Sequence, residues 1–199
     1  MVIGYELYPG TLYLNVTNRC SNDCAFCVRR RPGFSLGGFA MRLEREPLAA
    51  NVLADVARLE REHGGRFDEV VFCGFGEPTF RLELVSEVGR VLRGQGSRVR
   101  LNTNGHAALI AGADPMPLLD GALDAVSVSL NAPDATSYEA LCRPRFGPGA
   151  YHAMLDFARG ATKRFAEVTL TVVGCALEDQ AIEQAAQIAA EIGADFRVR

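Results

Sequence analysis

The chain has 199 residues, of which 48% are apolar and 23% charged, and its formal net charge is −3. These values are typical of one globular domain, residues 1–199, and the small negative charge argues against a general nucleic-acid binder. The start of the chain has no signal-peptide pattern, and no apolar run approaches the roughly 18 residues of a membrane span, so we expect a cytoplasmic protein without a membrane segment.

Short β-branched runs alternate along the chain with longer helical patterns, which is typical of βα units in a parallel sheet. Strands are predicted at residues 12–17, 69–74, 98–103, 125–131, 167–174 and 196–199. Apolar residues at helical spacing predict helices near 48–64, 84–94, 150–163 and 178–192. Residues 29–41, rich in Gly and Arg, are expected to form a loop over the mouth of the sheet. Six strands are too few for a closed eight-stranded barrel, so the α/β fold is either an open sheet or an incomplete barrel.

Three cysteines follow the first predicted strand: Cys20, Cys24 and Cys27, in the order C-S-N-D-C-A-F-C. We call residues 20–27 the cysteine loop. Three thiols in so short a loop can converge on one metal centre at little entropic cost, and in a cytoplasmic protein they favour metal binding over disulfides. A structural zinc site takes four protein ligands, and most [4Fe–4S] clusters take four cysteines. No Cys or His lies within thirty residues downstream of Cys27, so the site is either completed from far away or left open.

Unusual residue clusters follow each of the next three predicted strands. The second strand leads into C-G-F-G-E-P-T, residues 73–79, and the third into N-T-N-G-H, residues 102–106. The fourth carries Ser127, Ser129 and Asn131 on one face, where a barrel interior is ordinarily aliphatic. In parallel α/β folds, ligands bind beyond the carboxyl ends of the strands. These clusters and the cysteine loop are therefore expected to lie along one edge of the sheet.

Together these motifs resemble the radical S-adenosylmethionine (SAM) superfamily. The resemblance rests on C-x3-C-x2-C with an aromatic residue before the last cysteine, G-F-G-E-P after the second strand and L-N-T-N-G after the third. It runs over essentially the whole chain. Finer features resemble the small radical SAM proteins associated with TatD-type hydrolases: L-Y-L-N-V-T-N-R-C-S-N-D-C-A-F-C-V-R-R, L-N-A-P-D and L-C-R-P-R-F-G-P-G-A-Y.

The resemblance implies a partial (β/α)6 barrel, open on one side, with a [4Fe–4S] cluster held by Cys20, Cys24 and Cys27. It implies that the fourth iron takes the amino and carboxylate groups of SAM. Reductive cleavage of SAM then gives a 5′-deoxyadenosyl radical, which abstracts hydrogen from a substrate in an oxidoreductase- or lyase-like reaction. An electron donor such as flavodoxin or ferredoxin is expected as a partner.

The resemblance also implies which residues bind SAM. Phe26 is expected to lie with its backbone against the adenine. The turn after the second strand is expected to receive the amino group of SAM: Gly74, Gly76, Glu77 and Pro78. An ammonium group needs acceptors, and glycines let the main chain approach a ligand closely. The alternative is a plain turn, because Gly and Pro commonly follow strands, and Phe75 departs from the double glycine of the family.

Four further candidates each have a competing structural interpretation. By resemblance, Ser129 and Asn131 contact the ribose hydroxyls of SAM; alternatively, such polar residues cap the next helix. Arg143 is expected to bind a carboxylate or phosphate, unless it is a solvated basic residue. Cys142 is the candidate catalytic thiol, on a polar loop beside arginines that would lower its pKa; the alternative is a core thiol.

Several functions agree with these features. One is a tailoring enzyme that acts on a small molecule or a nucleotide, and another is an activating enzyme that installs a glycyl radical on a partner protein. A third is a non-enzymatic Fe–S or zinc module, which the G-F-G-E-P and T-N-G turns argue against. A six-stranded arc leaves a lateral opening, so we expect either a large substrate, of protein or nucleotide type, or a partner that closes the opening.

Overall fold

The computed structural model describes residues 2–30 and 34–199. Within them lies a seven-stranded sheet in the order β1-β2-β5-β6-β7-β8-β9. The strands are β1 (Gly4–Tyr8), β2 (Thr11–Leu14), β5 (Glu69–Phe72), β6 (Val99–Thr103), β7 (Ala125–Ser129), β8 (Glu167–Val172) and β9 (Asp195–Val198). Neighbouring strands are parallel except β1 and β2. The six predicted parallel strands are therefore confirmed, with slightly shorter bounds.

Helices cover one face of this sheet. They are α1 (Ala49–His63), α2 (Leu82–Gly94), α3 (Ala107–Ala111), α4 (Met116–Leu119), α5 (Ala135–Cys142), α6 (Gly149–Thr162) and α7 (Asp179–Ile192). Alternate strand residues such as Leu12, Phe72 and Leu101 pack beneath them in one core. In the described ranges, none of these helices is long and apolar enough to cross a bilayer.

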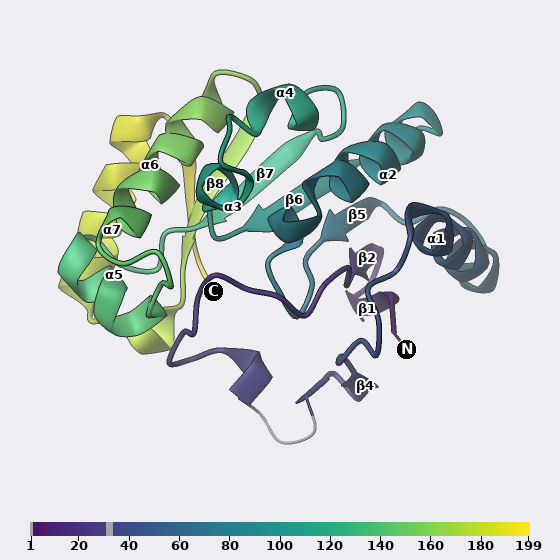
Figure 1. The fold of residues 1–199 in the computed structure, drawn as a ribbon, viewed down its shortest axis with the longest axis horizontal. Coiled ribbons are helices and arrows are strands. Elements are labelled where there is room, and N and C mark those ends of the chain that lie inside the picture. The colour runs from purple at the N-terminus through teal and green to yellow at the C-terminus, as the bar shows by residue number, and fades with distance from the viewer. Residues whose placement is uncertain (1, 31–33) are drawn as a thin grey trace.

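The sheet stays open, because β1 and β9 lie at its two opposite ends. This agrees with the predicted partial barrel. In Figure 1 the chain between β2 and α1 swings out away from α2, α4 and α6 before it returns to α1. That long connection contains the cysteine loop.

The structure adds elements that the sequence patterns did not predict. Strand β1 pairs antiparallel with β2, and the rings of Tyr5 and Tyr13 stack with centroids 5.5 Å apart. Gly10, with a φ of 77°, lies in the turn between the two strands. Helices α3, α4 and α5 were also missed, because each is too short for helical periodicity to register.

The segment predicted as an irregular loop, residues 29–41, contains a small hairpin of β3 (Ser35–Leu36) and β4 (Phe39–Ala40). Residues 31–33 of that prediction lie outside the described residues. The rings of Phe34 and Phe75 lie 5.3 Å apart, and the Met41 carbonyl accepts a 2.6 Å hydrogen bond from Asn15 Nδ2. The described part of the segment thus packs against the end of β2 and the turn that follows β5.

Candidate functional site

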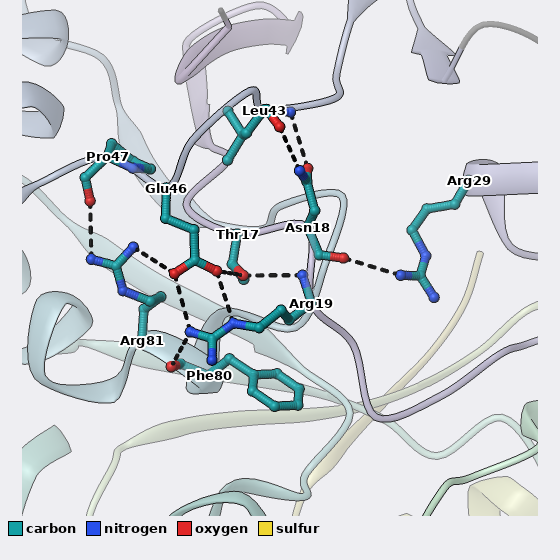
Figure 2. Close-up of polar contacts among 9 residues, drawn as sticks. All are labelled: Thr17, Asn18, Arg19, Arg29, Leu43, Glu46, Pro47, Phe80 and Arg81. Carbon is teal, nitrogen blue, oxygen red and sulfur yellow. Dashed lines mark hydrogen bonds and ion pairs between the residues drawn. The ribbon is translucent and has the colours of Figure 1, made fainter.

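The residues just before the cysteine loop are held by Glu46, which precedes α1 (Figure 2). Its carboxylate accepts hydrogen bonds from Thr17 Oγ1 at 2.5 Å, Arg19 Nε at 2.8 Å and Arg81 Nη1 at 3.1 Å. Partial burial raises the pKa of Glu46, but the hydrogen bonds from Thr17 and Arg19 outweigh it and hold that pKa below its usual range. Glu46 therefore joins three segments: the approach to the cysteine loop, the approach to α1 and the 3₁₀ turn Pro78–Arg81.

Asn18 fastens the same approach from the other side, as Figure 2 shows. Its Nδ2 donates to the Leu43 carbonyl at 2.7 Å, and the Leu43 amide donates back to Asn18 Oδ1 at 3.0 Å. Arg29 Nη1 donates to the Asn18 carbonyl at 3.2 Å. The main chain is thus fixed in position directly before Cys20.

The first residues of the cysteine loop contact a buried histidine, His106, and its partner Tyr138. Ser21 Oγ lies 3.0 Å from His106 Nδ1, and Tyr138 OH lies 3.0 Å from His106 Nε2. Asn104 Nδ2 donates to Ser21 Oγ at 2.8 Å, and Asn22 Nδ2 donates to Tyr138 OH at 3.1 Å. Burial lowers the pKa of His106 to about 4, so the imidazole is neutral and bridges one donor and one acceptor. Sequence reasoning gave His106 no role, although its place after N-T-N-G put it at the right edge.

The far side of the cysteine loop pairs with the end of α5 through backbone hydrogen bonds. The Asp23 amide donates to the Cys142 carbonyl at 3.0 Å, and the Ala25 amide donates to the Leu141 carbonyl at 2.8 Å. The Arg145 amide donates to the Ser21 carbonyl at 2.8 Å. The loop is therefore held along its length rather than left free in solvent.

The three cysteines of the loop are of the residue type that binds a [4Fe–4S] cluster. Cys20, Cys24 and Cys27 are all half-buried, and burial raises the pKa of Cys20 to about 12. Cys24 donates a hydrogen bond to the Cys142 sulfur, and this contact raises the pKa of Cys24. Among residues 2–30 and 34–199, no three His, Cys, Asp or Glu side chains lie close enough to hold a single metal ion. A [4Fe–4S] cluster binds each thiolate through a different iron, so its ligands surround it rather than share one point.

The glycines of the turn after β5 allow close approach to the segment before Cys20. A Cβ on Gly76 would lie 2.3 Å from the Arg19 carbonyl oxygen and 2.5 Å from that of Thr17. The Gly76 amide donates to the Thr17 carbonyl at 3.0 Å, and the Glu77 amide donates to the Arg19 carbonyl at 2.7 Å. A Cβ on Gly74 would lie 3.0 Å from Asn15 Oδ1, a less severe contact. The observed reason for glycine is therefore packing of this turn against the cysteine loop's approach.

The Glu77 carboxylate is buried and faces the next strand-end turn. Its Oε1 accepts from Thr79 N at 3.1 Å, Thr79 Oγ1 at 2.8 Å and Thr103 Oγ1 at 2.7 Å, and its Oε2 accepts from Asn104 N at 2.7 Å. Burial raises the pKa of Glu77 despite these bonds. Oε1 thus accepts three hydrogen bonds and Oε2 one, so one acceptor site on Oε2 is not used by these bonds. Pro78, also buried, begins the 3₁₀ turn that follows.

Asn131 has an unusual environment directly after β7. Its φ is 59°, in the left-handed region, and its side chain is buried. Its Nδ2 donates to Cys142 Sγ at 3.5 Å, while its Oδ1 has no hydrogen-bond partner among the described residues. The alternative role of helix capping belongs to Asp134, whose side chain accepts from the Ser137 amide at 2.9 Å. A buried acceptor without a donor is costly, and Asn22 Oδ1 in the cysteine loop is in the same condition.

The remaining predicted residues lie around the same edge. Phe26 is half-buried against the main core, and Ser129 Oγ accepts from Arg199 Nη2 at 3.2 Å. Arg143 ends α5 with a φ of 45°, and its Nη1 lies 3.9 Å from Asp23 Oδ2 in the cysteine loop. Cys142 is fully buried in the last turn of α5. Its pKa is lowered, foremost by the hydrogen bond from Cys24, and not by the neighbouring arginines that the sequence suggested.

Comparison with known proteins gives consistent matches. The model of the Radical SAM superfamily matches residues 14–189. Over 155 residues, 74% of the chain, the sequence is 32% identical to a probable dual-specificity RNA methyltransferase RlmN of Treponema pallidum (strain Nichols). The chain spans 40% of the length of that curated relative.

Two solved structures have the same fold. Streptococcus suis SuiB bound to S-adenosylmethionine gives a TM-score of 0.68 at 16% identity, over 96% of this chain and 40% of that one. A radical SAM methyltransferase from Sphaerobacter thermophilus gives a TM-score of 0.61 at 24% identity, over 96% of this chain and 56% of that one. Because the family match covers most of the sequence, this chain belongs to the radical SAM superfamily and is an enzyme that works with a [4Fe–4S] cluster and SAM.

Proposed function

We propose that this enzyme cleaves SAM reductively at the cysteine loop and that the radical abstracts hydrogen from a substrate on the open face of the sheet. One observation carries the proposal. The loop with three half-buried thiols bonds to the turn after β6 through Ser21 and Asn104, and the residues directly before it, Thr17 and Arg19, bond to the turn after β5 through the Gly76 and Glu77 amides. A rigid loop with three thiols and no fourth cysteine suits a cluster that leaves one iron for SAM.

Cys20, Cys24 and Cys27 would hold the cluster. The chemistry that a bound cluster and SAM supply is reductive cleavage of the sulfonium to a 5′-deoxyadenosyl radical. Arg29 supports thiolate ligands, because its guanidinium lies within hydrogen-bonding reach of Cys27 and its charge acts on Cys20. To bind iron, Cys24 gives up its contact with Cys142.

We assign the residues that bind SAM from the polar groups at the same edge of the sheet. We assign a ribose hydroxyl to the unpartnered Oδ1 of Asn131, with Ser129 beside it on β7. We also assign the adenine to the backbone of Phe26, and a carboxylate or phosphate to Arg143 at the end of α5.

The turn after β5 receives the amino group of SAM in this proposal. Because three of the four hydrogen bonds to the Glu77 carboxylate fall on Oε1, we assign the amino group to backbone acceptors of Gly74, Gly76 and Pro78 and to the remaining acceptor site on Glu77 Oε2. Glu77 also locks this turn to the one after β6.

Cys142 keeps its proposed catalytic role only if its sulfur reaches substrate. It is now buried behind Cys24 and Asn131, and cluster binding removes the Cys24 contact. Cys142→Ser should then retain SAM cleavage and lose substrate turnover. Unchanged turnover in this variant would make Cys142 a core thiol.

The finer identity rests on the motifs alone. The sequence features quoted above support membership of the TatD-associated subgroup, a single domain over residues 1–199 and a cytoplasmic location. We propose flavodoxin or ferredoxin as the electron donor and a protein or nucleotide as the substrate. The relatives agree with both substrate classes, since one is named as an RNA methyltransferase and a SuiB structure contains its precursor peptide.

Iron analysis and electron paramagnetic resonance test the proposal. Anaerobic reconstitution should load about four irons per chain, and SAM should alter the spectrum of the reduced cluster. Cys24→Ala should lose the cluster, whereas Cys175→Ala, which removes an exposed cysteine outside the loop, should keep it. Tight zinc with no SAM effect would support a structural module instead. A glycyl radical on a co-purified partner would identify an activating enzyme.

A further inference from the structure

The open face of the sheet, opposite the helices, carries polar side chains toward its carboxyl edge. Register aligns Ser129 of β7 with Thr171 of β8 and Arg197 of β9, so all three lie on one face. The intervening residues Leu170 and Phe196 face the helices. Two residues beyond Arg197, Arg199 therefore returns to the open face.

Acidic side chains on this face are already engaged further down the sheet. Arg100 Nη2 lies 2.7 Å from Glu69 Oε2, and Arg98 pairs with both Glu69 and Glu167. These two acids are thus neutralised by arginines of β6 and its approach. Neither Glu69 nor Glu167 is therefore available to pair with the arginines of β9.

Arg197 and Arg199 lack a carboxylate partner among residues 2–30 and 34–199. Asp195, on the same face, forms no ion pair with either of them in that range. Arg199 Nη2 donates to the neutral Ser129 Oγ at 3.2 Å, which leaves the other guanidinium donors available. Arg197 and Arg199 are close enough to repel each other, so an oxyanion bound by both would relieve that repulsion.

Arg199 reaches back across the sheet toward β7. To reach Ser129 its side chain crosses β8, so the guanidinium lies over the sheet rather than beyond its edge. Although the residue as a whole is exposed, local burial and the charges of Arg197 and Arg100 lower the pKa of Arg199. Cys73 and Cys24 are close enough to act on the same group.

We propose that Arg197 and Arg199 form an oxyanion site on the open face, and that the substrate carries a phosphate or carboxylate group held there. A guanidinium suits both groups, because its parallel N–H donors match two oxygens of either. This inference rests on the proposed function, since it places the anchored substrate before the cysteine loop.

Calorimetric titration with two probes tests the site. Inorganic pyrophosphate and malonate are titrated into the reconstituted protein at constant ionic strength, and the tighter probe identifies phosphate or carboxylate as the anchoring group. Arg197→Gln and Arg199→Gln should each weaken that probe about tenfold. Arg199→Lys should bind the probe more tightly than Arg199→Gln, because lysine keeps the positive charge but lacks the parallel N–H donors of a guanidinium. Arg61→Gln, which removes an exposed arginine at the end of α1, should bind as the wild type does.

SAM titration of the same variants separates this site from the cofactor site. The SAM dissociation constant of Arg197→Gln should match the wild type, since Arg197, unlike Arg199, is not hydrogen-bonded to Ser129. A parallel loss of SAM affinity would assign the arginines to SAM and overturn the substrate inference. Absence of saturable probe binding, or equal binding in all variants, would also overturn it. Neither outcome would touch the proposed function, because 5′-deoxyadenosine release is measured without substrate.

Discussion

His106 illustrates how a buried side chain can support the cysteine loop, the proposed cluster site, from beneath. Both ring nitrogens are engaged, one with Ser21 between two cysteines and the other with Tyr138. Since all of these groups are buried, the imidazole must remain neutral for the network to persist. The position of Ser21 is thus coupled to the protonation of His106.

The depressed pKa of His106 predicts a loss of stability in mild acid. An unfolded histidine titrates near pH 6.5, whereas the pKa of about 4 keeps the folded one neutral, so acid favours the unfolded chain. This group should cost about 2 kcal/mol of unfolding free energy between pH 7 and pH 5. Urea unfolding of the wild type and His106→Gln at both pH values measures the difference. An equal pH dependence in the two proteins would contradict it.

Gly76→Ala should disturb the cysteine loop. The new Cβ would collide with two backbone carbonyl oxygens, which cannot turn away as a side chain can. Overpacking of this kind costs about 1–3 kcal/mol, and we expect iron content after reconstitution to fall as well. Gly65→Ala is the matched control, since a Cβ there meets nothing within 4 Å. If Gly76→Ala matched that control in stability and iron content, the close approach of Gly76 to the segment before Cys20 would not be needed for the cysteine loop.

Among the elements, the connection between β2 and α1 depends on Glu46 to keep its two ends together. Glu46→Gln should lower stability by about 1 kcal/mol at neutral pH, and this difference should be lost as the pH falls below the ordinary carboxyl pKa of 4.5 and through the lowered pKa of Glu46 in the fold. Faster iron loss should accompany it. Glu62→Gln breaks an exposed pair with Arg58 and should change little. Equal effects of the two substitutions on unfolding and iron loss would contradict the role of Glu46.

The elements also show how far the sequence alone could lead. Long apolar patterns predicted the parallel strands and the four longest helices, because burial on one face leaves a readable period. Strand β1 and the short helices depend on tertiary partners, as in the pairing of Tyr5 with Tyr13. Ser21 and His106 are separated by 85 residues, and no local pattern announces such a contact. The cysteines were predictable because their spacing is local, whereas the distant residues that hold the loop in place, such as His106, were not.

For the whole molecule, topology explains why the site is at one edge. Parallel strands end on the same side, so the turns after β5 and β6 meet the loop after β2. The helices fill one face and leave the other with polar side chains. An open sheet of this kind admits a substrate from the side, which agrees with a large substrate or a closing partner.

Release of 5′-deoxyadenosine tests the central claim most directly. The anaerobically reconstituted wild type, incubated with SAM and dithionite, should release 5′-deoxyadenosine, and Cys175→Ala should match it. Cys20→Ala, Cys24→Ala and Cys27→Ala should each release none, because each lacks a cluster ligand. Iron-loaded wild type that leaves SAM intact, or a loop variant that still cleaves it, would contradict the assignment of the cysteine loop as the site of SAM cleavage.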